Sequence, residues 1–265
     1  MPLMRMTRVV LLSTTLLSSL PRLSGQEIET VKPMAREAHP SFEVAAIKLS
    51  DPNNQSGGFH TNGRRIFIEN RTVNFLIAFA YGMQKRQIVN EPGWLTSERF
   101  DIRGVPDIEG QPSEEQEKEM VRKLLEERFH LKFHREQRQM SRYTLTVAKG
   151  GEKMTPTRSS PDALPDQTGH QDASQESWRF TNNSMQQFAQ FLQFTLDRPV
   201  VDETGLTGRF DFKLQWTKDT APATEENAPP IFFTAIQEQI GLKVEPSNGA
   251  VDVLVIDGIG RPSVN

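Results

Sequence analysis

Arg198–Trp216 reads RPVVDETGLTGRFDFKLQW: a short apolar strand, a Gly-containing turn, and Arg-Phe-Asp at the start of a second strand. The same succession, preceded by an Asn and an amphipathic run, occurs in Asn70–Ile102 and in Asn183–Phe212. Arg99–Asp101 therefore corresponds to Arg209–Asp211. Because internal repetition outranks other sequence signals in assigning a fold, we predict that one α/β unit is used twice.

Amphipathic spacing and end-capping residues predict four helices, over Thr72–Tyr81, Ser113–His130, Ser184–Leu196 and Pro230–Gly241. The second is the most strongly marked, because Ser113 and Gln116 form a capping box and acidic residues follow in the first turn. Pro at the start and Gly at the end favour the fourth helix.

Each unit is expected to end in a hairpin. The first pairs Leu131–Phe133 with Tyr143–Val147, and the second pairs Leu242–Glu245 with Val251–Ile256. Alternation of apolar residues within these strands gives each one an inward and an outward face. The Asn- and Gly-rich segment Asp51–Arg64 is expected to be a loop.

The fold class that follows is α+β: two tandem copies of a strand-helix-strand-strand-helix-hairpin unit, with largely antiparallel sheets covered by helices. The expected organisation is a signal peptide over residues 1–25, a flexible leader over 26–41, a first repeat over 42–150, a linker over 151–177 and a second repeat over 178–265. The linker assignment rests on abundant Gly, Pro, Ser, Thr and Asp with few apolar residues.

The N-terminus has the pattern of a secretory signal. Arg5 and Arg8 precede an apolar run, Val9–Leu17, and Leu23–Gly25 contains small residues suited to cleavage. The run is shorter than the ~20 residues that span a bilayer, so we expect no stable membrane span after cleavage. The expected location is periplasmic or extracellular, and with no cysteine in the chain the fold cannot rely on disulfides.

The charge balance limits the partners. The chain has 31 basic and 34 acidic residues, and removal of Arg5, Arg8 and Arg22 leaves 28 basic residues and a net charge of −6. An acidic protein is poorly suited to nucleic acid or to an anionic membrane surface. A cell-envelope protein or a small ligand remains as the expected partner.

Several motifs together resemble a soil-associated, duplicated family of exported proteins that is abundant in Acidobacteria. They are AFAYGMQKRQIVNEPGWL, RFDIRG, LLEERFHLKFHRE, YTLTVAKGG, RPVVDETGLTGRFDFKLQW and VLVIDGIGRPSVN. The resemblance extends from about Phe42 to the C-terminus, although Glu91 stands where the family commonly has Gly. The family is biochemically uncharacterised and supplies no catalytic residues. Related domains attached to membrane metallopeptidases imply a sensing or interaction role.

The candidate ligand-binding residues are Asn54, His60, Asn62 and Trp94. The first three lie in the expected Asn/Gly loop, and loops carry binding residues more often than scaffolds do. An ordinary connection would have the same composition, because Asn and Gly readily occupy turns. Trp94 offers an aromatic face to a sugar or peptide, against the alternative that it packs at a core or rim.

No metal or cofactor is expected. His130 and His134 are four residues apart, but the helix is predicted to end at His130, so the two lack a shared helical face. The sequence has no nucleophile elbow, no His-Glu-x-x-His motif and no phosphate-binding Gly loop with Lys.

Two functions remain. The first is an exported, non-enzymatic binding or interaction protein, which includes a sensor-like role. The alternative is a secreted hydrolase that acts on a polymer in a cleft between the repeats. It would use carboxylates such as those of Asp101, Glu136, Asp202 and Asp211, two of which must lie within about 5–10 Å of each other.

Overall fold

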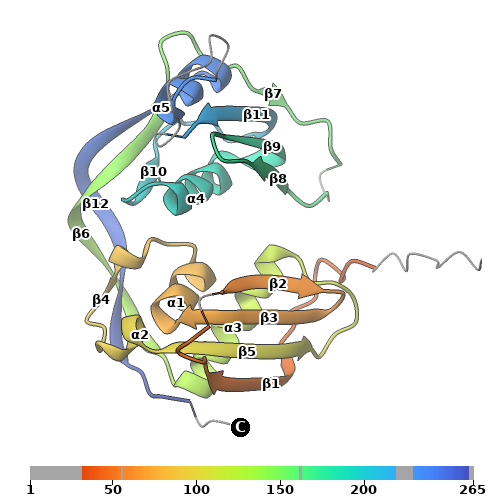
Figure 1. Ribbon diagram of the computed structural model, residues 1–265. Helices are drawn as coiled ribbons and strands as arrows, with labels where there is room; N and C mark the ends of the chain where they lie inside the picture. Colours follow the sequence, from red (N-terminus) through yellow and green to blue (C-terminus); the bar gives the residue numbers. More distant parts are fainter. Residues whose placement is uncertain (1–31, 55, 161–162, 219–228, 263–265) are drawn as a thin grey trace, which may run out of the picture. The chain divides into compact units, whose positions relative to one another are not determined.

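The computed structural model describes residues 32–54, 56–160, 163–218 and 229–262; the predicted signal peptide lies outside them. The first sheet contains four antiparallel strands in the order β1-β5-β3-β2 (Figure 1). Their bounds are β1 Phe42–Leu49, β2 Gly58–Asn62, β3 Arg65–Thr72 and β5 Arg99–Pro106. The segment expected to be a loop over Asp51–Arg64 therefore contains β2.

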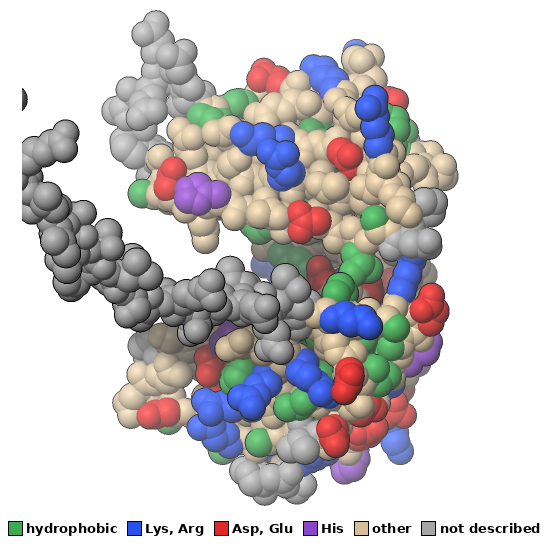
Figure 2. All heavy atoms as spheres, turned by 90° about the vertical axis from the view of Figure 1, so that its right-hand side faces the viewer, with side chains coloured by type: hydrophobic (Ala, Val, Ile, Leu, Met, Phe, Trp, Pro, Cys, Tyr) green, Lys and Arg blue, Asp and Glu red, His purple; other side chains and the backbone are tan. Residues whose placement is uncertain are grey.

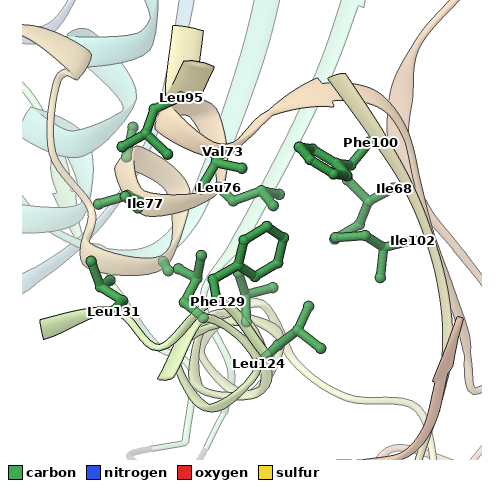
Figure 3. Close-up of a cluster of buried hydrophobic side chains, with 14 of the residues drawn as sticks. Ile68, Val73, Leu76, Ile77, Leu95, Phe100, Ile102, Leu124, Phe129 and Leu131 are labelled. Carbon is green, nitrogen blue, oxygen red and sulfur yellow. The ribbon is translucent and has the colours of Figure 1, made fainter. Parts of the chain in front are cut away.

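Two helices pack on this sheet, α1 (Val73–Tyr81) and α3 (Glu114–Phe129). Both begin as predicted: Thr72 caps α1, and the capping box of Ser113 and Gln116 is formed at α3. Phe100 of β5 meets Phe129 of α3 edge to face at a ring distance of 5.6 Å (Figure 3). These apolar contacts form the first core, which also includes Leu254 and Ile256 from near the end of the chain.

A second antiparallel sheet has the order β7-β11-β9-β8. Its strands are β7 Thr155–Pro156, β8 Asp166–Gln171, β9 Gln175–Ser184 and β11 Arg209–Thr217. Residues 151–177, expected to be a linker, thus contain β7, β8 and the start of β9. The strand β8 consists mainly of polar residues. It can do so because it lies at the edge of the sheet and its side chains are largely exposed.

Three helical segments accompany this sheet, α4 Met185–Thr195, α5 Phe232–Ala235 and the π-helical turn η2 Ile236–Ile240. A further short turn η1 (Lys85–Gln87) and the short helix α2 (Trp94–Ser97) lie between α1 and β5. Phe188 of α4 packs against Phe180 and Phe212 in the second core, with ring distances of 5.4 and 5.2 Å.

The third sheet is a long two-stranded ribbon with one short strand added on each side. β6 (Lys132–Val147) pairs antiparallel with β12 (Leu242–Gly258) along almost its whole length (Figure 1). β4 (Ile88–Val89) joins β12, and β10 (Val200–Asp202) joins β6, both in parallel. The two predicted hairpins are therefore wrong: each long strand pairs with the other instead of folding back on itself.

The ribbon links the two cores, because each of its long strands begins at one core and ends at the other. Leu145 of β6 is buried in the second core, although β6 directly follows the last helix of the first. Leu254 of β12 is buried in the first core, although β12 directly follows the last helical turn of the second. The fold class is α+β with mostly antiparallel sheets. Within the described residues, no helix is both long enough and apolar enough to span a membrane.

Candidate ligand-binding site

The Arg-Phe-Asp sequence of the first half holds a strained backbone position. Asn70 has a φ of +53° and lies two residues before Thr72, the N-cap of α1. Its backbone N–H donates to Asp101 Oδ1 at 3.0 Å, and its carbonyl accepts from Arg99 Nη1 at 2.9 Å. Asn is among the residues that tolerate the left-handed region best. Arg99 and Asp101 thereby fix the geometry from which α1 starts.

The second half contains the same arrangement. Asn182 has a φ of +57°; its N–H donates to Asp211 Oδ1 at 2.8 Å, and its carbonyl accepts from Arg209 Nη1 at 2.8 Å. The residue that corresponds to Asn70 is therefore Asn182, and not Asn183 as the sequence comparison suggested. The intervening Phe100 and Phe210 are both buried, with 2% and 7% of their surface exposed.

Asp101 is a structural carboxylate. Burial opposes its ionisation, but hydrogen bonds from Ser50 Oγ, at 2.7 Å, and from Asn70, together with nearby Lys48, outweigh burial and hold its pKa below the ordinary value. A carboxylate kept ionised by several donors is poorly suited to deliver a proton. The arrangement accounts for Asp101 without any catalytic role.

Each left-handed Asn also holds a loop with its side chain. Asn70 Nδ2 donates to the carbonyl of Asn54 at 2.9 Å, and Asn182 Nδ2 donates to the carbonyl of Ala163 at 2.6 Å. A hollow lies beside each loop, next to the arginine of the Arg-Phe-Asp sequence. We call them the Arg99 hollow and the Arg209 hollow.

The Arg99 hollow has a volume of about 550 Å³, within the range of small-molecule sites. Its lining comes from the ends of β1, β3 and β5, from the loop after β1 and from the end of α2: Leu49, Ser50, Asp51, Pro52, Asn54, Asn70, Ser97, Glu98 and Arg99. Leu49 is 56% exposed, which is unusual for a leucine beside a sheet. Asn54, one of the four predicted ligand-binding residues, is part of the lining of the Arg99 hollow.

Trp94 lies near this hollow without lining it. The guanidinium of Arg261 covers its ring at 5.0 Å, a cation–π geometry. Arg261 also binds both carboxylate oxygens of Glu98, which does line the hollow. Arg261 therefore occupies one face of the Trp94 ring, and that face is not available for stacking on a ligand.

His60 and Asn62 are placed elsewhere, on the edge strand β2. The His60 ring stacks on Phe67 with a centroid distance of 5.1 Å, and Asn62 pairs with Arg65 across the turn between β2 and β3. Both side chains are exposed. Neither lines the Arg99 hollow, so the structure separates them from Asn54.

The Arg209 hollow has a volume of about 610 Å³. Its apolar wall includes Leu164, Phe191 and Phe194, and 48% of Leu164 and 58% of Phe194 is exposed. The other wall comes from the first turns of α3 and the segment before β1. The remaining lining residues are Arg36, Ala38, His39, Ser113, Glu114, Glu115, Gln116, Lys118, Glu119, Arg122, Pro165, Asp166, Gln167, Gln187, Gln190 and Arg209.

Charges on the α3 wall are largely paired with one another. Lys118, which is only 4% exposed, binds Glu114 at 2.8 Å and Glu115 at 3.0 Å. Burial, followed by the negative charge of Glu114, raises the pKa of the adjacent Glu117 to about 7. The helix start therefore contributes an ionic network to the hollow that the exposed ring of Phe194 also lines.

The sequence hypothesis did not include the Arg209 hollow. Phe194 is the signal that would have found it, because it lies off the buried stripe of α4 formed by Met185, Phe188, Ala189 and Leu192. A large apolar residue on the polar side of an amphipathic helix marks an exposed apolar position.

No group of three or more His, Asp or Glu side chains among the described residues forms a metal site. His130 ends α3 with a φ of +54°, so it is a helix terminator. His134 lies on β6 between two carboxylates, with Nδ1 at 2.8 Å from Asp257 Oδ1 and Nε2 at 3.1 Å from Glu136 Oε1. The two histidines take separate structural roles.

The four acids of the hydrolase hypothesis also have separate environments. Asp101 and Asp211 each accept from the backbone of an Asn, Glu136 binds His134 and Arg138, and Asp202 accepts hydrogen bonds from Thr204. The Arg99 and Arg209 hollows contain none of these four side chains. Neither hollow therefore brings together the four carboxylates named in the hydrolase hypothesis.

The structure is thus an α+β protein with two hydrogen-bonded Arg-Phe-Asp sequences, and a hollow lies beside the arginine of each. Residues 74–259 match the family described as "Protein of unknown function (DUF3738)", so the chain belongs to this family. The matched segment includes both Arg-Phe-Asp sequences and the ribbon. No match was found among curated proteins or among solved structures.

Proposed function

We propose that the protein is an exported, non-enzymatic binding protein that holds a short polypeptide segment of a cell-envelope partner in the Arg209 hollow. The observation that carries the proposal is the exposure of Phe194 and Leu164 within one hollow. Large exposed apolar groups rimmed by polar residues mark interaction sites. A sensor-like role is one form of this activity.

The chemistry of the lining favours a peptide. Gln167, Gln187 and Gln190 place amide groups, which both donate and accept, next to the apolar wall. A peptide has the matching combination of backbone amides and an apolar side chain. The lining contains four basic side chains, Arg36, Lys118, Arg122 and Arg209, and four acidic ones, Glu114, Glu115, Glu119 and Asp166. This balance of charge favours a ligand without a large net charge.

The surface charge is consistent with this class of partner. On the face shown in Figure 2, basic and acidic side chains are interspersed with one another. Nucleic-acid binding requires a concentrated basic surface. The mixed distribution therefore supports a protein or peptide partner.

We further propose that the two halves are copies of one unit that have exchanged their last strands. In both sheets the strands lie side by side in the same order, first, fourth, third and second as counted along the chain. These orders are β1-β5-β3-β2 and β7-β11-β9-β8. Arg99 pairs with Thr72 as Arg209 pairs with Ser184, and an irregularity follows at the same place. Because β6 ends in the second core and β12 ends in the first, each unit completes its core with a strand from the other.

Export is proposed from the signal pattern of residues 1–25. Fractionation of cells that produce the full chain, with mass determination of the protein outside the cytoplasm, tests it. A mature N-terminus close to Gln26 supports export, and an intact chain confined to the cytoplasm contradicts it.

Binding is tested with three capped tripeptides, acetyl-Gly-Leu-Gly-amide, acetyl-Gly-Phe-Gly-amide and acetyl-Gly-Gly-Gly-amide. Backbone amide NMR should show saturable shifts at residues 164–167 and 187–194 with the Leu and Phe peptides, and weaker shifts with the Gly peptide. Phe194→Ser should weaken this binding. Phe233→Ser is the matched control, because Phe233 is 41% exposed but does not line the hollow.

The absence of saturable shifts with all three peptides at millimolar concentration would contradict the proposal. Equal weakening by both serine variants would also contradict it, because the effect would then not belong to the Arg209 hollow.

A further inference from the structure

We infer that the Arg99 hollow is a second ligand site and that it takes the same class of ligand, a short peptide segment with an apolar side chain. The inference rests on the proposed function. It adds a site in the first half of the chain, so that each protein molecule binds two segments. The evidence is that the same contacts hold a loop beside the arginine in both hollows, although the walls from α3 and α4 belong to the Arg209 hollow alone.

Both hollows have the same structural support. In each half, a left-handed Asn side chain donates to a carbonyl in the adjacent loop. The residue that starts each loop is fixed as well, because Ser50 N donates to the carbonyl of Arg99 and Thr157 N to that of Arg209, both at 2.9 Å. These contacts hold each loop beside its arginine.

The lining chemistry is also shared. The Arg99 hollow has exposed Leu49 near Pro52 and Asp51, and the Arg209 hollow has exposed Leu164 followed directly by Pro165 and Asp166. Leu49 precedes its loop and Leu164 ends the other, so the two leucines are not equivalent positions. The combination of an exposed leucine, a proline, an aspartate and an arginine is nevertheless present in both.

The arginines indicate how a peptide is recognised. Arg99 donates to the carbonyl of Asn70, and Arg209 donates to the carbonyl of Asn182 and to Gln187 Oε1. One part of each guanidinium is thereby fixed. Its other N–H groups are then preorganised to donate to a peptide carbonyl, while the leucine contacts an apolar side chain.

The test is an NMR titration of the full-length protein with acetyl-Gly-Leu-Gly-amide, following residues 49–54 and 97–99 separately from residues 164–167 and 187–194. The expected result is saturable shifts in both groups. Leu49→Ser should weaken binding at the first group about tenfold and leave the second unchanged, and Leu164→Ser should do the reverse. Both leucines are exposed, so neither change removes a core contact; thermal melting checks that the variants are folded.

The outcomes separate the two proposals. Binding confined to residues 164–167 and 187–194 overturns the second site and leaves the proposed function intact. Binding at neither group overturns both. Binding confined to residues 49–54 and 97–99 overturns the two-site inference and moves the proposed function to the Arg99 hollow.

Discussion

The backbone N–H of Asn70 donates to the carboxylate of Asp101, which lies 31 residues further along the chain. Asp101 thereby satisfies a donor at a left-handed residue that has no partner from regular secondary structure. Asn182 and Asp211 repeat this relationship across 29 residues. The recurring Asp of the Arg-Phe-Asp sequence is explained by the need to hold the chain where a strand ends and a helix begins.

Asp101→Ala should therefore destabilise the protein. The change leaves the Asn70 N–H and the Ser50 hydroxyl without their acceptor, which costs about 1–3 kcal/mol in the free energy of unfolding. Urea denaturation measures this loss. Glu109→Ala is the control at an exposed acid that should have almost no effect. A loss no larger than that of the control would show that Asp101 does not hold this geometry.

The lowered pKa of Asp101 also predicts a pH dependence. An acid with a depressed folded-state pKa contributes stability that is present above its unfolded-state pKa, near 3.9, and is lost as the pH falls through the folded-state value. Between pH 5 and pH 3 the wild type should therefore lose more stability than Asp101→Ala. Parallel pH profiles of the two proteins would contradict this prediction.

Glu117 predicts a slope of the opposite sign. Burial and the charge of Glu114 raise its pKa from 4.5 to about 7, so the folded protein binds an extra proton between these values. Stability should decrease as the pH rises through this window. Glu117→Gln should remove that slope and add about 1–2 kcal/mol at pH 8, less than the full shift implies because Glu117 retains some contact with water. Urea denaturation at pH 5 and pH 8 measures both effects.

The neighbouring charges define the control for this prediction. Lys118 lowers the pKa of Glu117 while it binds Glu114 and Glu115. Glu115→Gln removes one partner of Lys118 without removing Glu117, so the slope between pH 5 and pH 7 should remain. If the slope were lost in Glu115→Gln and persisted in Glu117→Gln, the titrating group would not be Glu117.

His134 should titrate above its ordinary range. Hydrogen bonds to Glu136 and Asp257 raise its pKa, so the stability from this contact is complete below the unfolded-state pKa and is lost as the pH rises through the folded-state value. Glu136→Gln should lower the pKa of His134 measured by NMR. Glu245→Gln, which instead removes a partner of Lys243 on β12, should leave it unchanged. High salt should also lower the pKa, because the contact is exposed.

Local sequence signals predicted α1, α3 and α4, and the fourth predicted helix is present as α5 followed by η2; they predicted neither α2 nor the ribbon. Thr72 and the pair Ser113 and Gln116 define their helix ends through contacts three residues apart. The partner of β6 lies about a hundred residues further along the chain, and strand alternation does not identify a distant partner. Residues 134–142, HREQRQMSR, lack Gly, Pro and Asn, which argues against the turn that was expected there.

The candidate site was likewise predicted only in part from the sequence. Asn54 was predicted because an Asn/Gly loop signals an exposed connection, and it lines the Arg99 hollow. His60 belongs to the same stretch of sequence, but the formation of β2 carries it along a sheet edge, away from Asn54. The Arg209 hollow depends on α3 and α4 together, and no spacing within either helix reports that they line one hollow.

The ends of the helices before β6 and β12 provide a matched pair of substitutions. His130 and Gly241 both have left-handed backbones, with φ of +54° and +70°. His130→Gly should stabilise the protein by about 0.5–1 kcal/mol, because glycine removes the strain of a side chain at positive φ. Gly241→Ala should destabilise it by more than 2 kcal/mol, because the added Cβ both strains the backbone and collides with the carbonyl of Gly151.

Gly93→Ala is the control for this pair, since its added Cβ has no neighbour within 4 Å and its backbone is not left-handed. Its free energy of unfolding should stay within about 0.5 kcal/mol of the wild type. Chemical denaturation of the three variants measures the order. If Gly241→Ala were tolerated as well as Gly93→Ala, the close contact between Gly241 and the carbonyl of Gly151 would not be required where β12 enters the ribbon. The tight turn that sends β12 toward β6 would then have to be explained by other residues.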